Sequence, residues 1–165
     1  MIAVILFFSS CGGAKPGATK STSLYETFFV GDAGSQYFIN PLIFVGTDNN
    51  KLLVDFTFRY KDRVKDSLTC NFSIINNIKM KKVDNLLLAG EDVSVKCENI
   101  TLLFNDTKGN QFLSRFSGRI LFADFNRLVN AGDFSIKADG KVYGMSAKTQ
   151  KSVKKLRKKL FVLFD

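Results

Sequence analysis

From Leu24 onward, apolar and polar residues mostly alternate, which is the pattern of β-strands with one buried and one solvated face. The clearest case is 52–60, where Val54, Phe56 and Phe58 are separated by polar residues. Since successive side chains of a strand point to opposite faces, we expect these three residues in the core.

The run 36–45 is more continuously apolar and is interrupted by Asn40-Pro41, so we expect a strand that is bent or lies at a sheet edge. The residues 47–50, Thr-Asp-Asn-Asn, tolerate left-handed backbone and are typical of a turn. The pattern therefore predicts a hairpin of 36–45 and 52–60.

Further strands follow. One surrounds Cys70, with alternating Leu68, Cys70, Phe72 and Ile74. A second hairpin is expected from 93–104 and 111–122, joined by a polar turn at 105–110. A third is expected from 134–138 and 141–145, because Asp139-Gly140 between them favours the tight turn of a hairpin. Residues 76–92 show no clear period.

Two helices are expected. Asp124 is suited to cap a short helix that runs through Ala131 and is ended by Gly132. Ser146 is suited to cap a final helix, whose apolar stripe is Val153, Leu156, Leu160, Leu163 and Phe164. Alternatively, residues 160–164 pair as a terminal strand.

The predicted fold class is mainly β: an antiparallel β-sandwich or partly open barrel of seven to nine strands, with a short helix and a C-terminal helix. The chain of 165 residues is 45% hydrophobic and contains 17 Phe, enough to pack a core without a metal or disulfide. We expect residues 24–165 to be a single β-rich domain.

The N-terminal residues have a different character. An apolar run, Ile2 to Phe8, is followed by Ser9-Ser10 and Cys11, and then by a segment rich in Gly, Ser, Thr and Ala. The sequence Phe8-Ser9-Ser10-Cys11 resembles the end of a bacterial lipoprotein signal peptide. The resemblance implies that residues 1–10 are a signal peptide remnant and that Cys11 carries a lipid such as palmitate.

The composition of residues 11–23 predicts a flexible tether between this lipid and the domain. The apolar run has seven residues, far fewer than the roughly 20 of a membrane-spanning helix. The alternative is that residues 1–10 form an ordinary buried strand and that Cys11 is an incidental thiol.

Cys70 and Cys97 are the other cysteines, and each alternates with apolar residues, so both side chains are expected to face the interior. In an exported protein they could form a disulfide. The alternative is two buried free thiols that pack as small hydrophobic groups. A metal site is not expected, because two thiols without a His or a third Cys leave zinc short of ligands.

The chain has no His, which excludes Ser-His-Asp and Cys-His catalysis and imidazole metal sites. Ser152 and Lys155 match an S-x-x-K spacing, but 13 Ser and 18 Lys produce such a pair by chance. The same holds for the glycosylation triplets at Asn71, Asn99 and Asn105. We expect no catalytic residue and no cofactor.

Positive charge is concentrated at the C-terminus. Residues 147–165 carry a net charge of +6 out of +9 for the chain. The bases are Lys148, Lys151, Lys154, Lys155, Arg157, Lys158 and Lys159. They either form the solvated face of a helix that closes the sheet, or contact anionic lipid or another polyanion. Nucleic acid is not expected as a partner, because no aromatic residue is interleaved with the bases.

Together these features predict a lipid-anchored cell-envelope protein with a binding or structural role and no enzymatic activity. The expected location is the periplasm-facing side of a Gram-negative outer membrane, and the candidate partners are the membrane and an envelope protein. The alternatives are an envelope hydrolase that uses carboxylates and a carrier of an apolar ligand.

Overall fold

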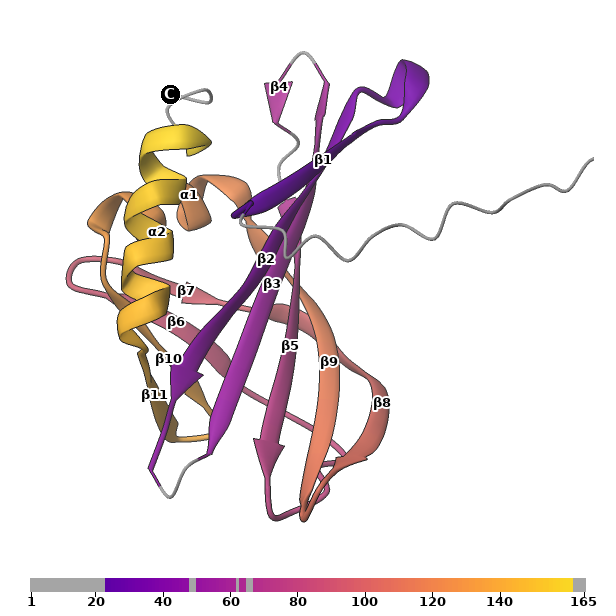
Figure 1. Cartoon of the computed structure of the whole chain (residues 1–165), viewed down its shortest axis with the longest axis vertical. Coiled ribbons are helices and arrows are strands. Elements are labelled where there is room, and N and C mark those ends of the chain that lie inside the picture. The colour runs from indigo at the N-terminus through magenta and orange to yellow at the C-terminus, as the bar shows by residue number, and fades with distance from the viewer. Residues whose placement is uncertain (1–22, 48–49, 62, 65–66, 162–165) are drawn as a thin grey trace, which may run out of the picture.

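The computed structural model describes residues 23–47, 50–61, 63–64 and 67–161, and in these the protein is a curved antiparallel sheet that nearly closes into a barrel, with two helices packed together against it (Figure 1). The strands are β1 Tyr25–Phe29, β2 Ser35–Val45, β3 Lys51–Lys61, β4 Arg63–Val64, β5 Ser67–Asn76, β6 Leu86–Gly90, β7 Ser94–Lys96, β8 Glu98–Lys108, β9 Gln111–Leu121, β10 Phe134–Ala138 and β11 Lys141–Met145. The helices are the short 3-10 helix η1 Gly31–Ala33, α1 Phe122–Ala131 and α2 Ala147–Lys159. The mainly β class with a C-terminal helix is confirmed, although the described strands number eleven and not seven to nine.

The order of the strands explains how the sheet closes. It runs β7-β6-β10-β11-β2-β3-β5-β9-β8, with β1 and β4 paired beside β2 and β3. The two end strands, β7 and β8, are consecutive in the chain and separated only by Cys97. One bent segment therefore pairs with β6 on one side of the bend and with β9 on the other.

This bend corrects the expectation of one continuous strand at 93–104. Asn99 has a positive φ of 52°, and the register with β9 shifts between Glu98 and Thr101. Beyond the bend, large apolar side chains of β8 are exposed to solvent, and Leu103 and Phe104 are about half exposed. The alternation through Val95 and Cys97 thus applies only to the part of the segment that faces β6.

The break at Asn40-Pro41 lies where the sequence predicts a bent strand. The register between β2 and β3 shifts between Ile39 and Leu42. On the other edge of β2, β1 pairs with the residues before the break, and β11 pairs with Phe44 and Val45 after it. The break therefore marks a fork at which two strands share one edge of β2.

The core confirms the predicted faces of β3 and β5. The inward residues are each at most 3% exposed: Val54, Phe56, Phe58, Leu68, Cys70 and Phe72. The ring centroid of Phe56 lies 4.1 Å from that of Phe125 in α1. Phe72 stacks on Phe116 of β9, with ring centroids 5.3 Å apart. Side chains from both walls and from the helices thus fill the barrel interior.

The ends of the smaller elements follow local sequence, with one exception. Gly132, with a φ of 83°, ends α1, and Asp139 and Gly140 have the positive φ values of a tight hairpin turn. The exception is Asp124, which is wrong as a cap: α1 begins at Phe122, directly after β9, so Asp124 lies in its first turn and pairs with Arg127.

The turn of the second hairpin is also shorter than the expected 105–110, because β8 extends to Lys108 and β9 begins at Gln111. At the C-terminus, Leu160 keeps right-handed helical backbone angles directly after α2 and Phe161 is in a helical turn, which contradicts a terminal strand at these two positions. Both side chains are fully buried. Leu163 and Phe164 lie outside the described residues.

Replacing Phe56 by Ala should lower the free energy of unfolding by about 3–5 kcal/mol, because it removes a fully buried ring that touches α1. Denaturant-induced unfolding measures this loss. Phe29→Ala is the matched control, since this ring is 80% exposed and its removal should change stability by about 0.5 kcal/mol or less. A loss below about 1 kcal/mol for Phe56→Ala would contradict its place in the core.

Candidate functional site

Helix α2 is fixed to the sheet at its N-terminus. Ser146 caps the helix as predicted, and its hydroxyl accepts the Thr149 N–H at 3.2 Å. The Thr149 hydroxyl accepts the N–H of Ile43 at 2.8 Å and donates to the Ile43 carbonyl at 2.7 Å. Because Ile43 lies just beyond the break in β2, this hydroxyl satisfies backbone groups in the gap between β1 and β11.

The two faces of α2 have opposite environments. Val153, Leu156 and Leu160 are fully buried, which confirms the predicted apolar stripe for its three described members. All seven bases are exposed: Lys148, Lys151, Lys154, Lys155, Arg157, Lys158 and Lys159. The helix is therefore packed and its bases face solvent, while their contact with an anionic surface stays a prediction.

Hollows flank α2 on two sides, and each is lined by three of its seven bases. The larger, about 770 Å³, lies toward the end of α1 and is lined by Lys154, Arg157 and Lys158 together with Asp133. The other, about 470 Å³, lies toward the start of the described domain. Its lining includes Ser23, Leu24, Lys148, Lys151 and Lys155.

Asn40 fixes the start of the described domain beside this second group of bases. Its side-chain amide donates to the Ser23 carbonyl at 2.7 Å, and its backbone N–H donates to the Leu24 carbonyl at 3.0 Å. We call Ser23 and Leu24 the root. Cys11 and the rest of the expected tether up to residue 22 lie outside the described residues.

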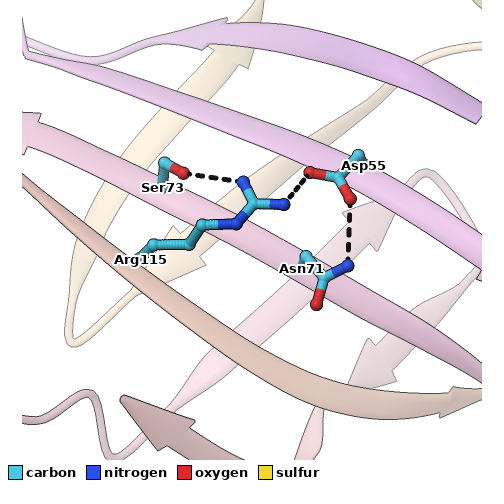
Figure 2. A network of polar contacts seen from close by, with 4 residues as sticks. All are labelled: Asp55, Asn71, Ser73 and Arg115. Atoms are coloured by element: carbon cyan, nitrogen blue, oxygen red, sulfur yellow. Dashed lines mark hydrogen bonds and ion pairs between the residues drawn. The ribbon is translucent and has the colours of Figure 1, made fainter. Parts of the chain in front are cut away.

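A polar network that sequence reasoning missed lies on the outer face of the barrel (Figure 2). Arg115 of β9 donates to Asp55 of β3 at 2.7 Å and to the Ser73 hydroxyl of β5 at 3.0 Å, and Asn71 donates to Asp55 at 3.0 Å. Both charged side chains are less than one third exposed. The sequence pattern indicates that these residues point outward from their strands. It does not indicate which strands are neighbours.

This network joins three strands and leaves neither charged group without a partner. The carboxylate of Asp55 accepts a bond on each oxygen, and the guanidinium of Arg115 reaches two acceptors. Such mutual satisfaction is typical of a structural network. It also occupies the amide of Asn71, one of the three residues in glycosylation triplets.

Paired acids, which the hydrolase alternative requires, occur in two shallow hollows. Glu91 and Asp133 line one of about 540 Å³, and Glu98 and Asp124 line one of about 400 Å³. Glu91, Asp133 and Glu98 are exposed, and Asp124 pairs with Arg127. None of them has the enclosed apolar setting that is typical of a catalytic general acid.

Cys70 and Cys97 meet in the barrel interior as free thiols. They hydrogen-bond to each other, and this bond and burial raise the pKa of the Cys70 thiol well above its usual range. The same bond lowers the pKa of the Cys97 thiol, and a bond from the backbone N–H of Arg119 adds to this effect. The inward orientation is confirmed, and the disulfide stays a prediction.

Two classes of feature are absent from the described residues. None of the helices there combines the length and apolar content needed to cross a membrane. The same residues contain no cluster of three or more His, Cys, Asp or Glu side chains that could hold a metal ion.

The chain matches no protein-family model, no curated protein and no solved structure with which it was compared. Its role must therefore be inferred from its own residues. Among these, the concentration of exposed bases on α2 beside the root is the most specific local arrangement.

Replacing Thr149 by Val should destabilise the protein by about 2 kcal/mol, because Val keeps the shape of the side chain but removes the hydroxyl. The part-buried N–H of Ile43 then loses this partner, and its carbonyl keeps the N–H of Ser146. Thr149→Ser keeps the hydroxyl and is the matched control, with an expected loss of about 1 kcal/mol or less. Chemical denaturation followed by circular dichroism gives both values. Equal losses for Val and Ser would show that the hydroxyl does not hold α2.

Proposed function

We propose that the protein is a lipid-anchored cell-envelope protein in which the bases of α2 hold the domain against the anionic surface of a membrane. Its role in this proposal is binding or structural support and not catalysis. The observation that carries it is the position of the root, which shares a hollow with Lys148, Lys151 and Lys155. The chain that leads from a lipid on Cys11 would therefore join the domain next to its most basic surface.

The two contacts complement each other physically. A single acyl chain binds a membrane only marginally, and stable attachment needs a second signal such as a basic patch. Each base near an anionic surface contributes about 1 kcal/mol, within a Debye length of about 8 Å at physiological salt. Seven exposed bases on one helix supply such a signal.

The length of the tether makes the charge necessary for orientation. Residues 11–22 span at most about 40 Å when extended, which would permit several faces of the domain to meet the membrane. The net charge outside residues 147–165 is only +3, so α2 is the surface that anionic headgroups attract most strongly. Tethering also raises the local concentration of this surface at the membrane.

Two observations favour surface binding over the alternatives. Fully buried rings such as Phe44, Phe72 and Phe116 fill the barrel, whereas a carrier of an apolar ligand needs an open cavity there. The paired acids lie in solvated hollows, whereas a carboxylate hydrolase needs acids with contrasting environments. The periplasmic face of an outer membrane and a protein partner within the envelope are parts of the proposal that depend on the anchor.

Metabolic labelling with a fatty-acid probe tests the anchor. The wild-type protein should take up the probe, and Cys11→Ala should lose it. Cys97→Ala is the matched control, because it removes a buried thiol and should leave labelling unchanged. Labelling that persists in Cys11→Ala would show that Cys11 is not the lipidated residue.

Co-sedimentation with vesicles tests the basic surface without the lipid, using the chain that begins at Gly12. Binding to anionic vesicles at low salt should exceed binding to neutral vesicles and should weaken at high salt. Changing Lys148, Lys151 and Lys155 together to Glu should lower the affinity at least tenfold, at about 1 kcal/mol per base.

The matched control changes the same net charge elsewhere, at the exposed residues Lys79, Lys81 and Lys108. It should retain most of the binding. An equal loss in both triple variants would show that only net charge matters. Equal binding to anionic and neutral vesicles, or none to either, would leave α2 as a solvated face.

A further inference from the structure

The two buried thiols meet at the point where the barrel closes. Cys97 occupies the bend between β7 and β8, and its N–H continues the pairing with β6 by donating to the Leu86 carbonyl at 2.9 Å. Cys70 lies in the middle of β5, on the opposite side of β9 from β8. The contact between the thiols thus joins the bend to the wall of the barrel across β9.

Gly118 makes this contact possible. It is the β9 partner of Cys70, and a Cβ atom at this position would lie 2.4 Å from the Cys97 sulfur. Atoms cannot approach so closely, so any other residue would displace the Cys97 side chain from Cys70. The Cys97 sulfur therefore occupies the position that a side chain at residue 118 would take.

We propose that Cys70 and Cys97 are a modification site, at which oxidation forms a disulfide that ties β5 to the bend between β7 and β8. The inference concerns the domain itself and is independent of the lipid anchor and of α2. The Cys97 sulfur lies over Gly118, the β9 residue that is paired with Cys70, and both thiols are at most 1% exposed. They lie on different strands and so are not held together by sequence proximity.

The oxidant is a disulfide compound, either glutathione disulfide or the disulfide of an oxidising protein. The Cys97 thiolate attacks one sulfur of that compound, which forms a mixed disulfide and releases one thiol. Cys70 then loses its proton and attacks the Cys97 sulfur, which releases the second thiol. Two protein thiols are oxidised, and one disulfide of the oxidant is reduced to two thiols.

Cys97 is the better first nucleophile, because its pKa is lowered while that of Cys70 is raised. Burial limits access to both, so oxidation must occur during folding or when the bend opens. The bend is suited to open, since β7 has three residues and, among the described strands, pairs with β6 alone. The disulfide would then hold closed the segment that completes the barrel.

The experiment uses the full chain with Cys11→Ala, so that only this pair can react within one molecule. Refolding with a glutathione redox buffer should give a protein lighter by two hydrogens, with a Cys70–Cys97 linkage in its peptide map. The oxidised form should melt about 5–10 °C above the reduced form, because the link closes a loop of about 27 residues.

Two further variants serve as controls. Cys70→Ala and Cys97→Ala, each added to Cys11→Ala, should lose both the mass change and the response of the melting temperature to oxidant. Two free thiols, or only glutathione adducts, after refolding of the parent to its native fold would overturn the proposal. The mass and peptide map of the parent decide this even if a variant fails to fold.

Discussion

The break in β2 at Asn40-Pro41 is the constraint on which the arrangement of the candidate site depends. Asn40 binds the carbonyls of Ser23 and Leu24, and Ile43 binds Thr149 of α2 through both its N–H and its carbonyl. Between them, Pro41 has no N–H to pair with a neighbouring strand. Partners outside the strands therefore accept the backbone N–H groups on the two sides of the break, namely the root for Asn40 and the basic helix for Ile43.

The placement of α2 shows how packing and charge are separated on one short helix. A buried stripe and one hydroxyl fix its position, so the bases take no part in holding it to the sheet. Lysines near the last turn also face the partial negative charge of the helix C-terminus, which favours their presence there. Their side chains thus remain available to solvent anions.

Much of the fold can be predicted from the sequence where the determining contacts are local. The parity of Val54, Phe56 and Phe58 gives the buried face of β3, Asp139-Gly140 gives a hairpin, and Ser146 gives the start of α2. In each case a few neighbouring residues decide the structure, either through strand period, turn conformation or a capping bond.

The remaining features depend on contacts that have no local signal. Period two shows which residues face inward but not which strand is the neighbour, so the pairing of Asp55 with Arg115 could not be predicted. The closure at Cys97 and the early start of α1 arise from the geometry of the whole barrel. The clustering of bases was visible in the sequence, but their position beside the root was not.

The attachment of the root has a mechanical consequence. A pull on the chain before Ser23 acts first on the two bonds made by Asn40 and then on the five-residue ladder between β1 and β2. The bonds of Thr149 to Ile43 lie beyond the fork, outside this line of load. In a protein anchored through Cys11, tension would therefore separate β1 from β2 and lengthen the chain between the anchor and the domain, while α2 stays packed on β2.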